Sequence, residues 1–230
     1  MPPNLSTKPL PPLSKDGSTH VTDEFYNTLI SSLGAVLILG GTAYLLYRSM
    51  QLHSSRHAIG AAVYGVGALS VFVSSALHHG VDGSPRTNFL LRQVDYLAIF
   101  LMISGTFTPF CLLVLPADAG RQTLWLVWIL ATLGIATKAL CPPLPKWVTL
   151  AMTLGMGWLG LLLVQPVYQA MAWPGLAGLA LGGACFTIGG AIFGLERPNP
   201  RPGRFGFHEI WHCLVVSGAM CHFASISMLY

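Results

Sequence analysis

Two histidines near the end of the chain could bind one metal ion together. His208 and His212 are four residues apart, and this step on an α-helix places both imidazoles on one face, about 6 Å apart along the axis. A third imidazole from a neighbouring helix would complete a three-histidine site that keeps a fourth position open, as in catalytic zinc sites. His78 and His79 are the candidates for this third ligand.

Two other polar residues could assist such a site. Asp95 could accept a hydrogen bond from a bound water or orient a ligand. Ser75 precedes His79 by four residues, so it lies on the same helical face, one turn before His79 and deeper in the predicted span.

The elements that carry these residues are strongly apolar. Of the 230 residues, 53% are hydrophobic and only 9% are charged, against about 25% in a soluble domain. This composition excludes an ordinary water-soluble domain, a disordered chain and a nucleic-acid-binding protein. The five cysteines form no Cys-x-x-Cys pair, so we interpret them as small packing residues.

Apolar runs long enough to cross a bilayer recur between short polar breaks. Residues 1–25 precede them as a flexible polar tail that lacks the pattern of a signal peptide. The sequence therefore predicts an all-α integral membrane protein, a bundle of seven transmembrane helices. The predicted spans are 26–47, 58–79, 93–115, 123–140, 147–167, 174–194 and 207–229.

The distribution of basic residues predicts the orientation of this bundle, because cytoplasmic loops carry the excess of Lys and Arg. Nine lie in or beside the tail and the second, fourth and sixth connections: Lys8, Lys15, Arg86, Arg92, Lys138, Lys146, Arg197, Arg201 and Arg204. Three lie on the other side: Arg48, Arg56 and Arg121. We therefore expect a cytoplasmic N-terminus and a C-terminus outside.

In this topology, the ionisable residues of three spans lie at one depth. His79 is in the last turn of span 58–79, Asp95 is in the first turn of span 93–115, and the two later histidines begin span 207–229. Ionisable groups inside membrane spans are costly and usually functional. The alternative, histidines that face lipid headgroups at the interface, does not account for this convergence.

The sequence His208-Glu209-Ile210-Trp211-His212 also matches the His-Glu-x-x-His motif of zinc proteases. Such a protease in a membrane would need a third ligand downstream, usually acidic, and no carboxylate side chain follows His212. This interpretation is therefore disfavoured. His222 is too far from His212 to share its ion, so it either lines a cavity or bonds to a neighbouring helix.

These motifs together resemble the hemolysin III family. They comprise Ser75-Ala76-Leu77-His78-His79, Asp95, Gly105-Thr106-Phe107-Thr108-Pro109 and the His208–His212 motif, in that order. The family is the bacterial branch of the progestin and adipoQ receptor group, which includes the adiponectin receptors and is distantly related to alkaline ceramidases. The resemblance covers all seven spans. The chain departs from the family pattern at His78 and Phe107, where tyrosine is common. In the family pattern, the four-residue step from Ser75 identifies His79 as the ligand and leaves His78 as its neighbour.

The resemblance implies a zinc ion held by His79, His208 and His212, with a water between zinc and Asp95. Ser75 would be a nearby polar or oxyanion-stabilising group. The implied activity is ceramidase-like hydrolysis of a lipid amide in the bacterial inner membrane: zinc polarises the carbonyl and lowers the pKa of water, and Asp95 acts as base. Membrane lipids are the expected partners, with a lipid substrate in a cavity within the bundle, and the role would be membrane lipid and energy homeostasis.

Two other functions remain open. One is a non-enzymatic sensor or homeostasis factor with a structural zinc, which the same histidines predict equally well. The other is a channel or haemolysin, as the family name suggests, but pore formation needs no such zinc site and spans 123–140, 147–167 and 174–194 offer little polar lining. An open ligand position with an apolar cavity leading to it would favour hydrolysis.

Overall fold

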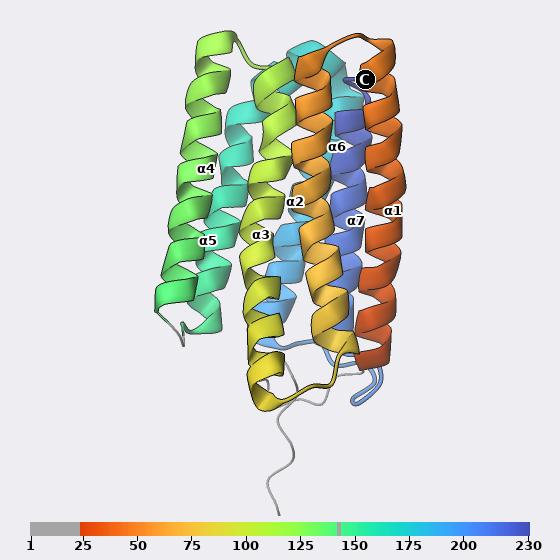
Figure 1. Ribbon diagram of the computed structural model, residues 1–230, viewed down its shortest axis with the longest axis vertical. Coiled ribbons are helices and arrows are strands. Elements are labelled where there is room, and N and C mark those ends of the chain that lie inside the picture. The colour runs from red at the N-terminus through yellow and green to blue at the C-terminus, as the bar shows by residue number, and fades with distance from the viewer. Residues whose placement is uncertain (1–23, 142–143) are drawn as a thin grey trace, which may run out of the picture.

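The computed structural model describes residues 24–141 and 144–230, and every regular element in these two ranges is a helix (Figure 1). Most of the predicted tail, residues 1–25, lies outside the described residues, and Glu24 and Phe25 belong to the first helix. The elements are α1 (Glu24–Gln51), α2 (Ser55–Gly80), α3 (Pro85–Leu113), α4 (Ala117–Leu140), α5 (Lys146–Trp158), the 3₁₀ helix η1 (Leu159–Leu163), α6 (Val164–Leu195) and α7 (Phe207–Ser227).

Six helical stretches in the described part of the chain are long and apolar enough to cross a membrane. Their outer surfaces are rich in large apolar side chains, such as Val66, Leu133 and Leu33, which are 68%, 56% and 55% exposed. Helices that satisfy their own backbone hydrogen bonds and expose apolar side chains suit a lipid environment. The chain is a multi-pass membrane protein.

The longest of these stretches, Lys146–Leu195, reverses its direction. As one straight helix, its 50 residues would extend over about 75 Å. Instead, Lys146 at its start forms an ion pair with Glu196, directly after its end. The reversal occurs at Ala172, whose φ of 52° and ψ of −153° are not helical, within the polar break that the sequence predicts between spans 147–167 and 174–194.

Two helices, α3 and α4, begin more than one turn earlier than the apolar pattern predicts. α3 begins at Pro85 instead of residue 93, because Ser84 Oγ accepts a hydrogen bond from the Thr87 N–H at 3.2 Å and proline is favoured in a first turn. α4 begins at Ala117 instead of residue 123, directly after Pro116. A search for apolar runs does not detect these first turns, because they are polar, although they belong to the same helices.

The contact between α2 and α3 is close enough to bring their backbones together. A Cβ atom on Gly67 would lie 2.5 Å from the carbonyl oxygen of Leu101, and one on Gly105 would lie 2.9 Å from that of Val63. Small residues are favoured where membrane helices approach this closely. This contact fixes the end of α2, which carries His79, relative to the start of α3, which carries Asp95.

One end of the bundle gathers the polar residues singled out in the sequence. We call it the histidine end: it is formed by the first turns of α1, α3, α5 and α7 and by the last turns of α2, α4 and α6 (Figure 1). α7 ends at the opposite end of the bundle, where the C-terminus is marked.

Candidate metal centre

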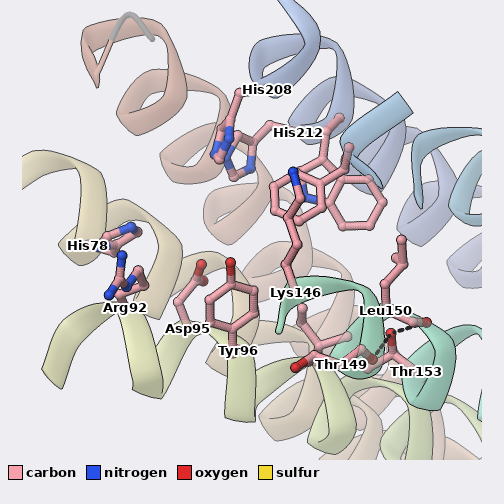
Figure 2. A pocket seen from close by; sticks show the side chains of 13 residues that line it. His78, Arg92, Asp95, Tyr96, Lys146, Thr149, Leu150, Thr153, His208 and His212 are labelled. Carbon is pink, nitrogen blue, oxygen red and sulfur yellow. Dashed lines mark hydrogen bonds between the residues drawn. The ribbon is translucent and has the colours of Figure 1, made fainter. Parts of the chain in front are cut away.

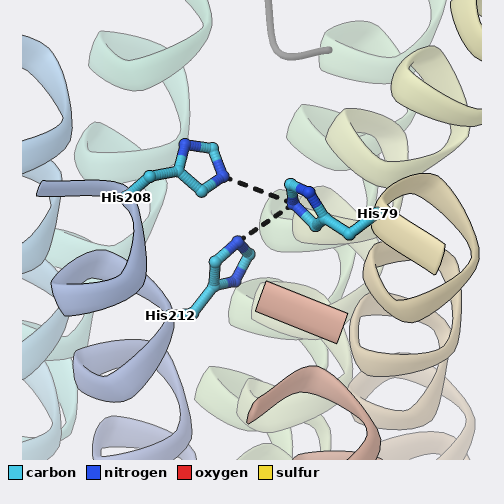
Figure 3. Close-up of side chains that lie close together, drawn as sticks. All are labelled: His79, His208 and His212. Atoms are coloured by element: carbon cyan, nitrogen blue, oxygen red, sulfur yellow. Dashed lines mark hydrogen bonds between the residues drawn. The ribbon is translucent and has the colours of Figure 1, made fainter. Parts of the chain in front are cut away.

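Three buried imidazoles converge at the histidine end. The Nε2 atom of His79 on α2 lies 3.3 Å from Nε2 of His208 and 3.1 Å from Nε2 of His212, both on α7 (Figure 3). The side chains are 2%, 4% and 7% exposed, respectively. The predicted ligand set is thus brought together from two helices that are far apart in the sequence.

This arrangement fits a metal ion. Tetrahedral ligands at about 2.0–2.1 Å from zinc place neighbouring nitrogens about 3.3 Å apart. One ligand atom from each of the three histidines lies within 4.8 Å of the others. Such a group of nitrogen atoms, enclosed in the bundle, could hold a metal ion, and imidazole ligands suit zinc, copper, iron and nickel.

A carboxylate from α1 orients one of the three imidazoles. Glu24 Oε2 accepts a hydrogen bond from Nδ1 of His79 at 2.5 Å. With its proton on Nδ1, the His79 ring presents the lone pair of Nε2 to the other two histidines, an outer-shell arrangement typical of metal sites. The sequence analysis missed this residue. The signal that could have found it is an acidic residue in the first turn of an apolar helix.

The start of α7 is held by two hydrogen bonds, each from a backbone N–H group to a side-chain oxygen. The Gly206 N–H donates to Glu209 Oε2 at 2.7 Å, and the Phe207 N–H donates to Asn199 Oδ1 at 3.1 Å. The buried Glu209 carboxylate, 1% exposed, thereby closes the first turn that carries His208. This arrangement gives Glu209 a structural task and supports the rejection of the protease interpretation.

Asp95 and Ser75 have different immediate partners. Asp95 Oδ1 accepts a hydrogen bond from the Ser74 hydroxyl at 3.2 Å. The hydroxyls of Ser75 and Ser31 are hydrogen-bonded to each other at 2.9 Å, where α2 is packed on α1. The sequence analysis selected Ser75 from its spacing to His79 and missed Ser74, which reaches Asp95 on the neighbouring helix.

A small cavity of about 50 Å³, lined in part by polar side chains, connects Asp95 with His208 and His212 (Figure 2). Its lining residues are His78, Arg92, Asp95, Tyr96, Ile99, Lys146, Thr149, Leu150, Thr153, Phe193, His208, Trp211 and His212. His78 is only 2% exposed, and its Nδ1 has no hydrogen-bond partner among the described residues. The cavity therefore offers donors and acceptors to a bound polar group next to the histidines.

A larger cavity of about 550 Å³ adjoins the small one. The two share Ile99, Leu150, Thr153 and Trp211, and the rest of the larger lining is mostly apolar. Its volume is typical of ligand-binding pockets. His222 lines this cavity and donates from Nε2 to the Leu179 carbonyl at 3.3 Å, so both predicted alternatives for His222 are confirmed.

Comparisons with known proteins show to which family the chain is similar. The family model described as "Haemolysin-III related" matches residues 19–223. The chain is 32% identical to "Hemolysin-3" of Bacillus cereus over 209 residues, which cover 88% of this chain and 90% of that protein. It is 29% identical to "Hemolysin-3 homolog" of Bacillus subtilis (strain 168) over 203 residues, 88% and 92% of the two chains.

A weaker similarity extends to a eukaryotic receptor. The chain is 23% identical to "Adiponectin receptor protein" of Drosophila melanogaster over 212 residues, 85% of this chain and 48% of that protein. No solved structure matches the chain.

Proposed function

The chain belongs to the haemolysin III family, and on this premise we propose that it is a zinc-dependent hydrolase of a lipid amide in the bacterial inner membrane. One observation carries the proposal: two of the three clustered buried histidines, His208 and His212, line a small cavity together with Asp95, and a large apolar cavity adjoins it. The apolar cavity would take the acyl chain, so that the amide bond lies between Asp95 and the histidines. The activity would serve membrane lipid and energy homeostasis.

Each residue of the site has a role in this reaction. His79, His208 and His212 would hold the zinc ion, which when bound polarises the amide carbonyl and lowers the pKa of water. Asp95 takes a proton from the attacking water and delivers it to the departing nitrogen. Ser75, held by Ser31, supports α2 one turn from His79.

The proposed topology is seven crossings with a cytoplasmic N-terminus. The reversal at Ala172 supports it, because it divides Lys146–Leu195 into two antiparallel arms. The positive-inside rule supports the orientation, because Arg86, Arg92, Lys138 and Lys146 lie near the histidine end. The metal site would then lie near the cytoplasmic surface.

Metal content is the first test of the proposed function. Elemental analysis of detergent-purified protein, without chelators, is expected to find about one zinc per chain in the wild type, and none after His212→Ala. His222→Ala is the matched control and should keep its zinc, since His222 bonds to Leu179 instead. Absence of metal from the wild type would overturn the proposal.

Catalysis is tested separately with Asp95→Asn. This variant should keep its zinc but release fatty acid from lipid amides about 10²–10⁴-fold more slowly than the wild type, because the proton acceptor is lost. Equal rates of the two proteins would remove Asp95 from the mechanism.

The second candidate function is a sensor with a structural metal. The observation that favours it is that the site joins three helices, through Glu24 on α1, His79 on α2 and His212 on α7. In this case, zinc would raise the unfolding temperature of the protein, while neither the wild type nor Asp95→Asn would hydrolyse any lipid amide.

A further inference from the structure

One face of α3 changes from charged to apolar along its length. Arg92 and Asp95 line the small cavity near the histidine end, Ile99 lines both cavities, and Met102 and Thr106 line only the large one. From Arg92 to Ile99 is about 10 Å along the helix. A ligand that follows this face meets a cation, then the proposed catalytic carboxylate, then an apolar wall.

A face of α5 repeats the same order. Lys146, the first residue of the helix, lines the small cavity, Leu150 and Thr153 line both cavities, and Leu154 and Gly157 line only the large one. The two helices therefore place a cation at the same end of the combined cavity. The ammonium of Lys146 pairs with Glu196, but its three N–H donors allow further acceptors, and the Arg92 guanidinium has five.

The lining of the small cavity holds two cations and one carboxylate, and one of the cations, Lys146, is already paired with Glu196 outside the lining. Arg92 and Lys146 contribute two positive charges to its lining, and Asp95 contributes one negative charge. The buried Nδ1 of His78 adds a polar atom without a partner in the described residues. Cationic groups in a cavity with low-dielectric walls attract ligands of the opposite charge.

The geometry points to a substrate with a single acyl chain and an anionic group on the amine side of the amide. This inference rests on the proposed hydrolase function. The acyl chain occupies the large cavity, the amide lies at Asp95 and the histidines, and the anionic group lies in the small cavity that Arg92 and Lys146 line. A carboxylate or a phosphate would meet these requirements, as in an N-acyl amino acid or an N-acyl phosphoethanolamine.

The reaction on such a substrate balances with water alone. The water oxygen forms a bond to the amide carbon, and one water proton passes through Asp95 to the nitrogen. The carbon–nitrogen bond then breaks with its electron pair on nitrogen. The products are a fatty acid and an amine that carries the anionic group.

The test compares lipids that share one acyl chain. Zinc-loaded protein is assayed with N-palmitoylglycine (carboxylate), N-palmitoyl phosphoethanolamine (phosphate) and N-palmitoylethanolamine (neutral). We expect kcat/KM to be at least about tenfold higher for one or both anionic lipids, as for one charge-assisted hydrogen bond. The ratio between the two anionic lipids shows which group the cations recognise.

Variants then locate the preference. Arg92→Gln and Lys146→Gln should each lower the ratio of kcat/KM for the preferred lipid to kcat/KM for the neutral lipid about tenfold. Arg86→Gln is the matched control, because Arg86 is exposed in the first turn of α3 and lines neither cavity. Zinc content measured in each variant shows that the site has folded.

Two results would overturn the inference: equal hydrolysis of neutral and anionic lipids, or a preference that survives both cavity variants. In either case, the proposed hydrolase would stand.

If the wild type hydrolyses none of the three lipids, the proposed hydrolase function fails. A binding assay then tests whether the cavity recognises an anionic headgroup. Tryptophan fluorescence should then report tighter binding of an anionic lipid, weakened by Arg92→Gln and with the signal lost in Trp211→Phe, since Trp211 lines both cavities. Equal binding of all three lipids would overturn the inference.

Discussion

Glu24 Oε2 accepts a hydrogen bond from Nδ1 of His79 at 2.5 Å, and Nε2 of the same ring lies 3.1 Å from Nε2 of His212. The first turn of α1 thus determines which nitrogen of a buried imidazole on α2 faces α7. A candidate metal site on two helices is oriented by a third, because the carboxylate fixes the tautomer and the rotation of the His79 ring.

Loss of this carboxylate should weaken metal binding. In Glu24→Gln, a neutral amide replaces the carboxylate at Nδ1 of His79, so we expect zinc affinity to fall about 10–100-fold. The measurement is a zinc titration in competition with a chelator of known affinity. Asp118→Asn is the control: it removes an exposed carboxylate that pairs with Arg121 in the first turn of α4, at the other end of the bundle. Equal affinities of the two variants would contradict the role of Glu24.

The two adjacent serines of α2 should give different phenotypes. Ser74→Ala removes the hydrogen bond to Asp95, and hydrogen bonds to charged groups contribute about 1.5–3 kcal/mol, so we expect lipid amide hydrolysis to slow about tenfold or more. Ser75→Ala removes the bond to Ser31 and should lower the free energy of unfolding by about 1 kcal/mol.

Ser31→Ala separates the two possible roles of Ser75. If Ser75 only supports the packing of α2 on α1, Ser31→Ala and Ser75→Ala will have the same turnover and the same loss of stability. A loss of turnover in Ser75→Ala alone would instead indicate that its hydroxyl stabilises the oxyanion of the reaction.

The cluster of three histidines could be predicted because local periodicity and ligand chemistry identify its members. The four-residue step from His208 to His212 is readable in one helix, and topology places His79 at the same depth. Glu24 and Ser74 could not be predicted in this way. Their partners, His79 and Asp95, lie on other helices, and contacts between helices leave no pattern within either segment.

The fold shows the same division between local and tertiary information. Apolar runs predicted where the helices lie, and the reversal at Ala172 falls in a predicted break. The early start of α3 was missed because it depends on the cap formed by Ser84 and on polar first turns, which an apolar pattern does not contain. The pairing of Lys146 with Glu196 depends on the reversal between them.

The close contact between α2 and α3 should make Gly67 intolerant of a side chain. In Gly67→Ala, the new methyl would meet the backbone carbonyl of Leu101, which cannot move as a flexible side chain could, so we expect a loss of about 1–3 kcal/mol in the free energy of unfolding. Thermal unfolding in detergent measures the effect. Gly40→Ala is the control, because nothing lies within 4 Å of a Cβ there. Unchanged stability of both variants would show that the two helices are less closely packed.

The proposed topology predicts which cysteines an impermeant reagent reaches in intact spheroplasts. Cys141 is exposed next to the end of α4 at the histidine end, so a membrane-impermeant maleimide should label it only after permeabilisation. In a Cys141→Ser background, Gln51→Cys at the end of α1 and Trp173→Cys at the reversal should both be labelled without permeabilisation, because both lie at the opposite end of the bundle.

Each variant tests a different part of the topology. Labelling of Cys141 in intact spheroplasts, with protection of Gln51→Cys, would invert the proposed orientation and place the metal site outside. Labelling of Gln51→Cys with protection of Trp173→Cys, which is 68% exposed in the folded protein, would mean that the chain does not reach the outer surface between α5 and the second arm of α6. The number of crossings would then be lower than seven. The Cys141→Ser protein without an added cysteine gives the background labelling for both measurements.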